Sequence, residues 1–125
     1  MARDVQLLVD ARRGRVLASR LERAHTFASR LKGLLLRSEF PAGAGLWLSP
    51  CRAIHTFGMR FPIDALFLDA RLRVVAVRER IAPWRLVRPV ARSTSVVELP
   101  AGTVGVTRAS VGDELSVEPV KAGGF

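Results

Sequence analysis

The residues Ile63–Leu68 form an almost continuous apolar run, interrupted only by Asp64, and this run constrains the fold more than any other feature. Such a run is typical of a central β-strand that is buried on both faces. A turn at Asp69–Arg71 follows, and apolar and polar residues then largely alternate up to about residue 80. Because alternation is the period of a strand, the sequence predicts a β-hairpin over about residues 63–80.

Further strand signals occur on both sides of this hairpin. Apolar residues alternate from Val5 to Val9, and a turn containing Gly14 leads into a second alternating stretch. This pattern predicts a first hairpin over about residues 4–23. Shorter apolar or β-branched segments bounded by turn residues predict additional strands at about residues 45–48, 95–99 and 114–118.

One segment has a helical pattern instead. Thr26 can cap a helix, and an apolar stripe follows at the spacing i, i+4, i+7 and i+8, formed by Phe27, Leu31, Leu34 and Leu35. We therefore expect an α+β fold that is mainly β. The two forms left open are a small barrel and a curled antiparallel or mixed sheet, each with one packed helix at about residues 26–36.

The chain length of 125 residues corresponds to one domain. The sequence has no repeat, low-complexity tract or linker, so we expect a single compact domain over residues 1–120 and a loose tail over residues 121–125. The apolar share of 49% and the charged share of 25% are ordinary for a globular protein and argue against disorder.

Cysteine content and apolar patterning bear on the compartment. Cys51 is the only cysteine, which excludes an internal disulfide framework and fits a reducing environment. The first ten residues contain aspartates on both sides of a short apolar run, unlike a signal peptide. No uncharged apolar stretch reaches the ~18 residues of a membrane-spanning helix. We predict a cytoplasmic protein that does not insert into membranes.

The formal net charge of +9 comes from 18 arginines and 2 lysines against 11 acidic residues. A positive field attracts polyanions, but the same composition can simply favour solubility. Both interpretations stay open. The first predicts binding of nucleic acid or another polyanion through a region rich in arginines, namely Arg71, Arg73, Arg78, Arg80, Arg85, Arg88 and Arg92.

Four motifs together resemble a known family. They are the stretch Ile54–Asp69, which includes His55-Thr56-Phe57-Gly58-Met59, the stretch Val97–Gly102, the helix residues Arg30, Gly33, Leu34 and Arg37, and the turn Gly112-Asp113. In order and spacing these motifs resemble the uncharacterised family called domain of unknown function 192, and they cover about residues 20–118. The resemblance implies a compact, mostly β fold and implies no activity.

The sequence departs from that family's pattern at one motif. Many members have Trp-Met-Lys-Asn where this chain has His55-Thr56-Phe57-Gly58, so no role of that Trp or Lys transfers to this chain. Many members also begin with a signal peptide, which is not expected here. The chain resembles a distinct branch of the family.

Polar residues inside the apolar signature segments define the first candidate site. A buried carboxylate is costly unless it is paired, so Asp64 and Glu98 need partners, and Arg30, Arg37 and His55 are the expected ones. Such a network can fix the fold or line a polar pocket with a tuned histidine. The pocket interpretation predicts ligand binding by His55, Thr56, Met59, Asp64, Glu98, Arg30 and Arg37.

A third hypothesis concerns Cys51 and His55, which could act as nucleophile and base in a small hydrolase or thiol enzyme. In an extended chain, however, residues four positions apart are about 13 Å from each other. No other sequence pattern indicates a metal, a cofactor or a catalytic triad. The patterns favour a non-enzymatic module that binds a small ligand or a protein over polyanion binding, and place an enzyme third.

Overall fold

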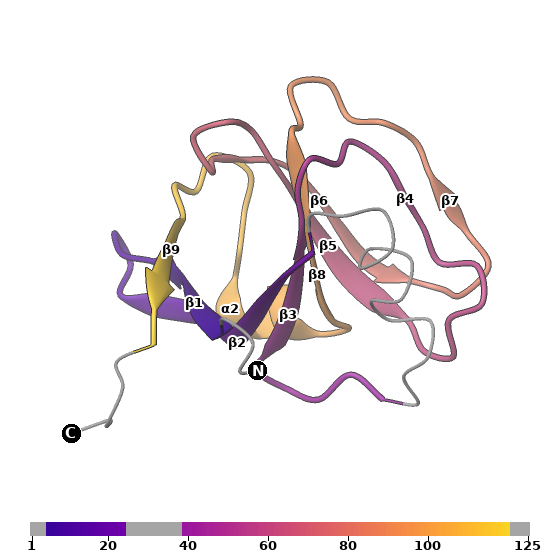
Figure 1. Ribbon diagram of the computed structural model, residues 1–125, viewed down its shortest axis with the longest axis horizontal. Helices are drawn as coiled ribbons and strands as arrows, with labels where there is room; N and C mark the ends of the chain where they lie inside the picture. The colour runs from indigo at the N-terminus through magenta and orange to yellow at the C-terminus, as the bar shows by residue number, and fades with distance from the viewer. Residues whose placement is uncertain (1–4, 25–38, 121–125) are drawn as a thin grey trace.

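Seven strands form one mixed sheet in the computed structural model, which describes residues 5–24 and 39–120. Neighbouring strands are antiparallel except β2 and β3, which are parallel. The order across the sheet is β6-β5-β8-β3-β2-β1-β9 (Figure 1). The bounds are β1 Val5–Asp10, β2 Arg15–Ala24, β3 Ala44–Leu48, β5 Ile63–Leu68, β6 Val74–Ile81, β8 Ser95–Pro100 and β9 Ser116–Pro119.

Two smaller elements complete the described part of the chain. β4 (Ile54–His55) and β7 (Leu86–Val87) pair as a separate two-stranded sheet, and α2 (Thr103–Thr107) is a short helix that follows β8. In Figure 1 the small sheet lies on the opposite side of the molecule from β9. No helix in the described ranges is long and apolar enough to cross a membrane.

The large sheet curls so that its two ends approach each other. Arg73, just before β6, bridges Glu114, just before β9. Backbone hydrogen bonds from Val74 N–H to Asp113 O (2.9 Å) and from Leu115 N–H to Leu72 O (3.0 Å) extend this connection. β6 and β9 themselves do not pair, so the sheet is curled and mixed and is not closed into a barrel.

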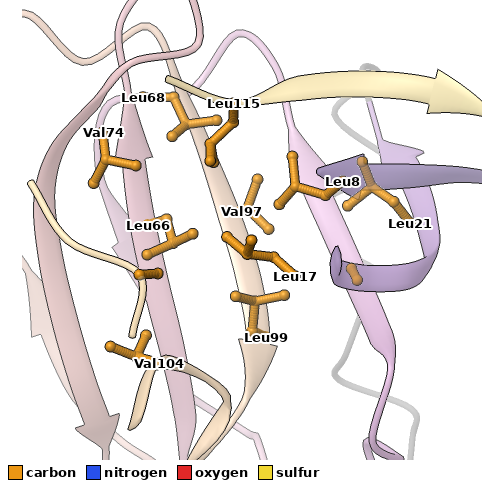
Figure 2. Close-up of a cluster of buried hydrophobic side chains, with 12 residues drawn as sticks. Leu8, Leu17, Leu21, Leu66, Leu68, Val74, Val97, Leu99, Val104 and Leu115 are labelled. Atoms are coloured by element: carbon orange, nitrogen blue, oxygen red, sulfur yellow. The ribbon is translucent and has the colours of Figure 1, made fainter. Parts of the chain in front are cut away.

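The curl encloses one hydrophobic cluster. Leu8 of β1 and Val74 of β6 come from opposite ends of the sheet order, yet both belong to it. Figure 2 shows side chains from the strands, from α2 and from the segment before β9 converging in this cluster. Val104 fixes α2 to it, and Leu115 closes it at the point where the two ends meet.

A second hydrophobic cluster covers the other face of β5 and β8. Ile63, Ala65 and Phe67 point into it from β5, while Leu66 and Leu68 point into the first cluster. Every residue of β5 is therefore buried. This double burial is the physical reason for the almost continuous apolar run in the sequence.

The predicted mainly β fold is confirmed. The first predicted hairpin corresponds to β1 and β2, with Gly14 at a positive φ of 67° in the turn, and the second corresponds to β5 and β6. Of the two predicted forms, the structure has the curled sheet. The predicted helix at about residues 26–36 and the predicted tail at 121–125 lie outside the described residues.

Candidate functional site

Asp64 is fully buried on β5, and backbone amides satisfy its carboxylate. Oδ1 accepts the N–H of Arg80 at 2.8 Å. Oδ2 accepts the N–H groups of Gly102 at 3.1 Å and of Val104 at 2.9 Å, where α2 begins. Since α2 has no capping side chain of its own, Asp64 supplies the acceptor that a helix N-terminus needs. Asp64 thereby joins β5, β6 and α2.

Glu98 is buried on β8, opposite Ala65 of β5 and Leu46 of β3. Burial raises the pKa of its carboxyl from the ordinary value of 4.5 to about 8. At neutral pH the group is therefore mostly a neutral carboxylic acid within the second hydrophobic cluster. No hydrogen bond joins its carboxyl to any residue in the ranges 5–24 and 39–120.

The register of β5 and β8 places these two acids on opposite faces of the sheet. Asp64 lies opposite Leu99, and Glu98 lies opposite Ala65. Because side chains alternate along a strand, Asp64 shares the face of Leu99 in the first cluster, whereas Glu98 shares the face of Ala65 in the second. The structure thus does not bring Asp64 and Glu98 into one pocket.

The described partners of Asp64 are backbone amides, and His55, one of the three partners that the sequence suggested, is not among them. The other two, Arg30 and Arg37, lie outside the described residues. His55 is exposed on β4, and within residues 5–24 and 39–120 the Asp64 carboxylate accepts hydrogen bonds from three backbone amides and from no cationic side chain. Three N–H donors and a helix start can compensate a buried negative charge without a salt bridge.

Thr56 is fully buried and organises the loop that precedes β7. Its hydroxyl donates to Ala82 O at 2.6 Å and accepts the N–H of Arg85 at 2.9 Å. Its backbone N–H donates to Arg85 O at 2.8 Å, and its carbonyl accepts the N–H of Trp84 at 2.9 Å. Thr56 is thus a positioning residue. Met59, also from the predicted site, is buried in the second cluster.

Three aromatic rings adjoin one another on the small sheet. The His55 and Phe57 ring centroids are 5.0 Å apart, and the Phe57 and Trp84 centroids are 6.2 Å apart with planes at 25°. Leu86 lies opposite His55 in the β4–β7 pair. Phe57 is 44% exposed, Trp84 66% and Leu86 70%. We call the set of His55, Phe57, Trp84 and Leu86 the aromatic surface.

Sequence reasoning missed this surface. From its type Phe57 is most simply assigned to the core, but the structure exposes it. The same assignment covers Trp47, Phe27, Phe40, Phe61 and Phe67. Phe67 is indeed buried, and Phe40 packs against Phe61 at a centroid distance of 6.0 Å. The available signal was the position of Phe57 beside Gly58 and of Trp84 beside Pro83, since such breaks place residues in surface loops.

The predicted arginine region follows the edge strand β6 and continues to β7. All seven of its side chains are exposed, but they are not equivalent. Arg73 forms a salt bridge of 3.0 Å with Glu114, which neutralises its charge. Arg78 and Arg80 lie near the end of β6, and Arg85 and Arg88 flank β7 beside the aromatic surface.

The two segments that carry the aromatic surface contain no acidic residue, and the exposed Glu79 directly precedes the second of them. The segments 51–63 and 80–97 hold six arginines and neither aspartate nor glutamate. All six are exposed, and within the described part of the chain none forms a salt bridge. We call Arg52, Arg60, Arg80, Arg85, Arg88 and Arg92 the arginine rim.

Cys51 and His55 make separate hydrogen bonds. The Cys51 thiol donates to Ala53 O at 3.1 Å. The Nδ1 atom of His55 accepts the N–H of Phe57 at 3.2 Å, which leaves the proton of a neutral ring on Nε2. Within the described ranges, no group of three potential ligands could hold a metal ion.

A cavity of about 370 Å³ lies near the other end of the sheet, between the β1–β2 turn and the turn before β9. Arg13 lies between two acids there, with Nε 4.0 Å from Asp10 Oδ2 and Nη2 3.6 Å from Asp113 Oδ1. The remaining lining residues are Arg12, Val111, Gly112 and Glu114. Its charges largely compensate one another, so this cavity presents no clear preference for a charged ligand.

Comparison with known proteins identifies similar chains. The model of the family named DUF192, described as "Uncharacterized ACR", matches residues 8–117. A UPF0127 protein from Thermococcus sibiricus is 32% identical over 117 residues, which cover 90% of this chain and 75% of that protein. The UPF0127 protein PH1112 from Pyrococcus horikoshii is 33% identical over 97 residues, which cover 74% of this chain and 82% of that protein.

Two solved structures share the fold. One is a candidate transcription regulator from Sinorhizobium meliloti, with a TM-score of 0.76, 24% identity and coverage of 93% of this chain and 94% of that one. The other is a protein of unknown function from Novosphingobium aromaticivorans, with a TM-score of 0.73, 23% identity and coverage of 90% and 83%.

Proposed function

Since this chain belongs to the uncharacterised family called domain of unknown function 192, we propose a function from its own surface: a non-catalytic module that binds an anionic ligand at the aromatic surface. This proposal joins the predicted binding site at His55 to the predicted polyanion-binding arginines. The observation that carries it is the arginine rim: its six exposed arginines form no salt bridge within the described residues, and the exposed acid beside them in the chain, Glu79, adjoins only Arg80, so the excess of positive charge favours an anion.

The geometry of the loop before β7 supports a prepared binding surface. Trp84 has a positive φ of 65°, a conformation that is uncommon and costly for a bulky residue. Four hydrogen bonds to Thr56 hold the segment Ala82–Arg85 in place. Strain that the surrounding structure maintains is often associated with function. In this loop the strained backbone conformation places the large Trp84 side chain in solvent.

The other polar residues of the predicted site support a binding role over catalysis. Asp64 is committed to three backbone amides, and Glu98 lies in an apolar cluster on the other face of the sheet. We assign Asp64, Thr56 and Met59 to holding the fold under the surface, and His55 to the surface itself. A hydrolase or thiol enzyme has less support, since the Nδ1 atom of His55 bonds to the backbone.

Two further points agree with this proposal. The relative from Sinorhizobium meliloti is described as a candidate transcription regulator, a class of protein that meets polyanions, although its 24% identity carries only the fold. We also expect the domain to act in the cytoplasm, where nucleic acids and other polyanions are abundant.

Inorganic polyphosphate is a suitable first probe because it offers charge without bases. We expect calorimetric titration to show binding at low salt that weakens steeply as salt increases, since bound phosphates release counterions. The double variant Arg85→Gln/Arg88→Gln should reduce the slope of log K against log salt by about 2. The matched control Arg12→Gln/Arg20→Gln removes the same net charge elsewhere and should change the slope little. Absence of binding at low salt would refute the proposal.

A further inference from the structure

We propose that the anionic ligand is single-stranded nucleic acid, whose bases stack on the aromatic surface while the arginine rim contacts its phosphates. This inference rests on the proposed function and specifies its ligand. It starts from a coincidence that a polyphosphate site does not need: the two segments that carry the exposed aromatic rings, 51–63 and 80–97, also carry the six arginines of the arginine rim.

The aromatic rings have the arrangement that base stacking requires. His55, Phe57 and Trp84 form a row, and Trp84 is at one end of it with two thirds of its surface exposed. A base can continue this row by stacking on the indole. Proteins that bind single strands combine such platforms with a basic groove or surface, and stacking tolerates any base because every base has a π-face.

The charges around the rings complement a single strand. Arg85 follows Trp84 directly in the chain, and Arg88 comes after β7. Both are exposed and form no salt bridge within residues 5–24 and 39–120. Guanidinium groups bind phosphate through two parallel hydrogen bonds and also stack on bases. Two arginines within four residues of Trp84 can therefore contact the phosphates next to a base that stacks on its indole.

Single strands suit this surface better than a duplex does. In a duplex the bases are already stacked on one another, so their faces are closed to the indole. No described helix is long enough to read a major groove, since α2 has five residues. A protein partner is the competing occupant of an exposed Trp and Leu pair, but six arginines that form no salt bridge with any described residue would then have to meet an acidic partner surface. A single-stranded nucleic acid provides both phosphates for the arginines and base faces for the exposed indole.

The test compares a fluorescently labelled oligothymidylate of about 12 nucleotides with a duplex of the same length, at low salt and at matched phosphate concentration. Anisotropy should show stronger binding of the single strand. Trp84→Ala should weaken it roughly tenfold or more, because each stacked base contributes substantially to affinity. Trp84→Phe should restore much of the loss, and Val106→Ala, which alters an 84% exposed residue on α2, should have no effect.

Indole emission provides a second, independent readout. Trp47 packs against the first hydrophobic cluster, so quenching by a stacked base should come from Trp84 and disappear in Trp84→Ala. Polyphosphate should bind without this quenching. If single strand and polyphosphate bind alike and Trp84→Ala changes neither affinity nor emission, stacking is refuted while anion binding stands. If neither binds at low salt, the proposed function fails as well, and the aromatic surface is better explained as a protein-docking site.

Discussion

The Oδ2 atom of Asp64 accepts the N–H of Val104 at 2.9 Å and so connects the start of β5 to the first turn of α2, 40 residues further along the chain. The same carboxylate also accepts amides from Arg80 and Gly102. One side chain thus fixes the relative positions of β5, the end of β6 and the helix that closes the first cluster.

Replacing Asp64 should therefore be among the most destabilising single changes in the protein. Asp64→Ala leaves three backbone N–H groups without their acceptor, and each such loss costs about 1–3 kcal/mol. We expect the free energy of unfolding in urea to fall by roughly 3–5 kcal/mol. Glu79→Gln, at an exposed position of β6, should change it by less than about 0.5 kcal/mol. A loss below about 1 kcal/mol in Asp64→Ala would contradict this role.

Glu98 should make stability depend on pH. Its pKa is about 8 in the folded protein and near 4.5 when unfolded, so the folded state retains a proton that the unfolded state loses. Stability is then greatest below about pH 4.5, decreases as pH rises through this window, and levels off above about pH 8. The decrease should approach about 1.4 kcal/mol per pH unit within the window.

The variant Glu98→Gln isolates this contribution because the amide has a similar shape and does not titrate. We expect it to remove most of the decrease, so that the variant is more stable than the natural protein at pH 9 but not at pH 4. Urea titrations at pH 4, 6.5 and 9 measure the difference. Glu114→Gln, at an exposed side chain, is the matched control. Parallel pH profiles for Glu98→Gln and the natural protein would show that Glu98 is not the source.

Thr56 offers a separate test of how the aromatic surface is held. Thr56→Val keeps the shape but removes a hydroxyl that both donates to Ala82 O and accepts from Arg85 N–H. Leaving both groups unpaired should cost about 1–3 kcal/mol. Looser packing of the loop should also change the emission and anisotropy of Trp84. Thr56→Ser retains the hydroxyl and should preserve the signal; equal effects of the two variants would exclude the hydroxyl as the cause.

Two glycines, one in a strand and one in a helix, should respond to substitution by alanine in opposite directions. A Cβ on Gly45 of β3 would lie 3.0 Å from Ala18 Cβ, 3.1 Å from Leu21 Cδ1 and 3.2 Å from Leu99 Cδ2. Gly45→Ala should therefore destabilise by about 1–3 kcal/mol through overpacking. Gly105 in α2 has open space around it, so Gly105→Ala should stabilise by about 0.5–1 kcal/mol. Thermal melts of the two variants and of the unmodified chain measure both changes in stability.

Local patterns predicted much of the sheet. The run Ile63–Leu68 and the alternation after it are properties of neighbouring residues, and they correspond to β5 and β6. The same holds for β1 and β2 around the turn at Gly14. In each hairpin the two strands are joined by a short turn. The alternation of apolar and polar residues and the turn residues therefore specify the pairing without contacts from distant parts of the chain.

The candidate site depended on contacts that no local pattern contains. Asp64 and Glu98 seemed equivalent in the sequence, as acids within apolar segments, but the register Ala65 to Glu98 decides that they face opposite sides of the sheet. The partners of Asp64 are 16, 38 and 40 residues away and use backbone amides, which any residue other than proline provides.

The type and spacing of neighbouring residues were therefore enough to specify the hairpins, the mainly β fold and the presence of buried acids. Which residues form a surface depended on tertiary contacts. His55 and Phe57 meet Trp84 because β4 pairs with β7 and because Thr56 binds the loop around residues 82–85. Exposure is a property of what packs against a side chain, and for Phe57 and Trp84 that depends on chain segments about 30 residues apart.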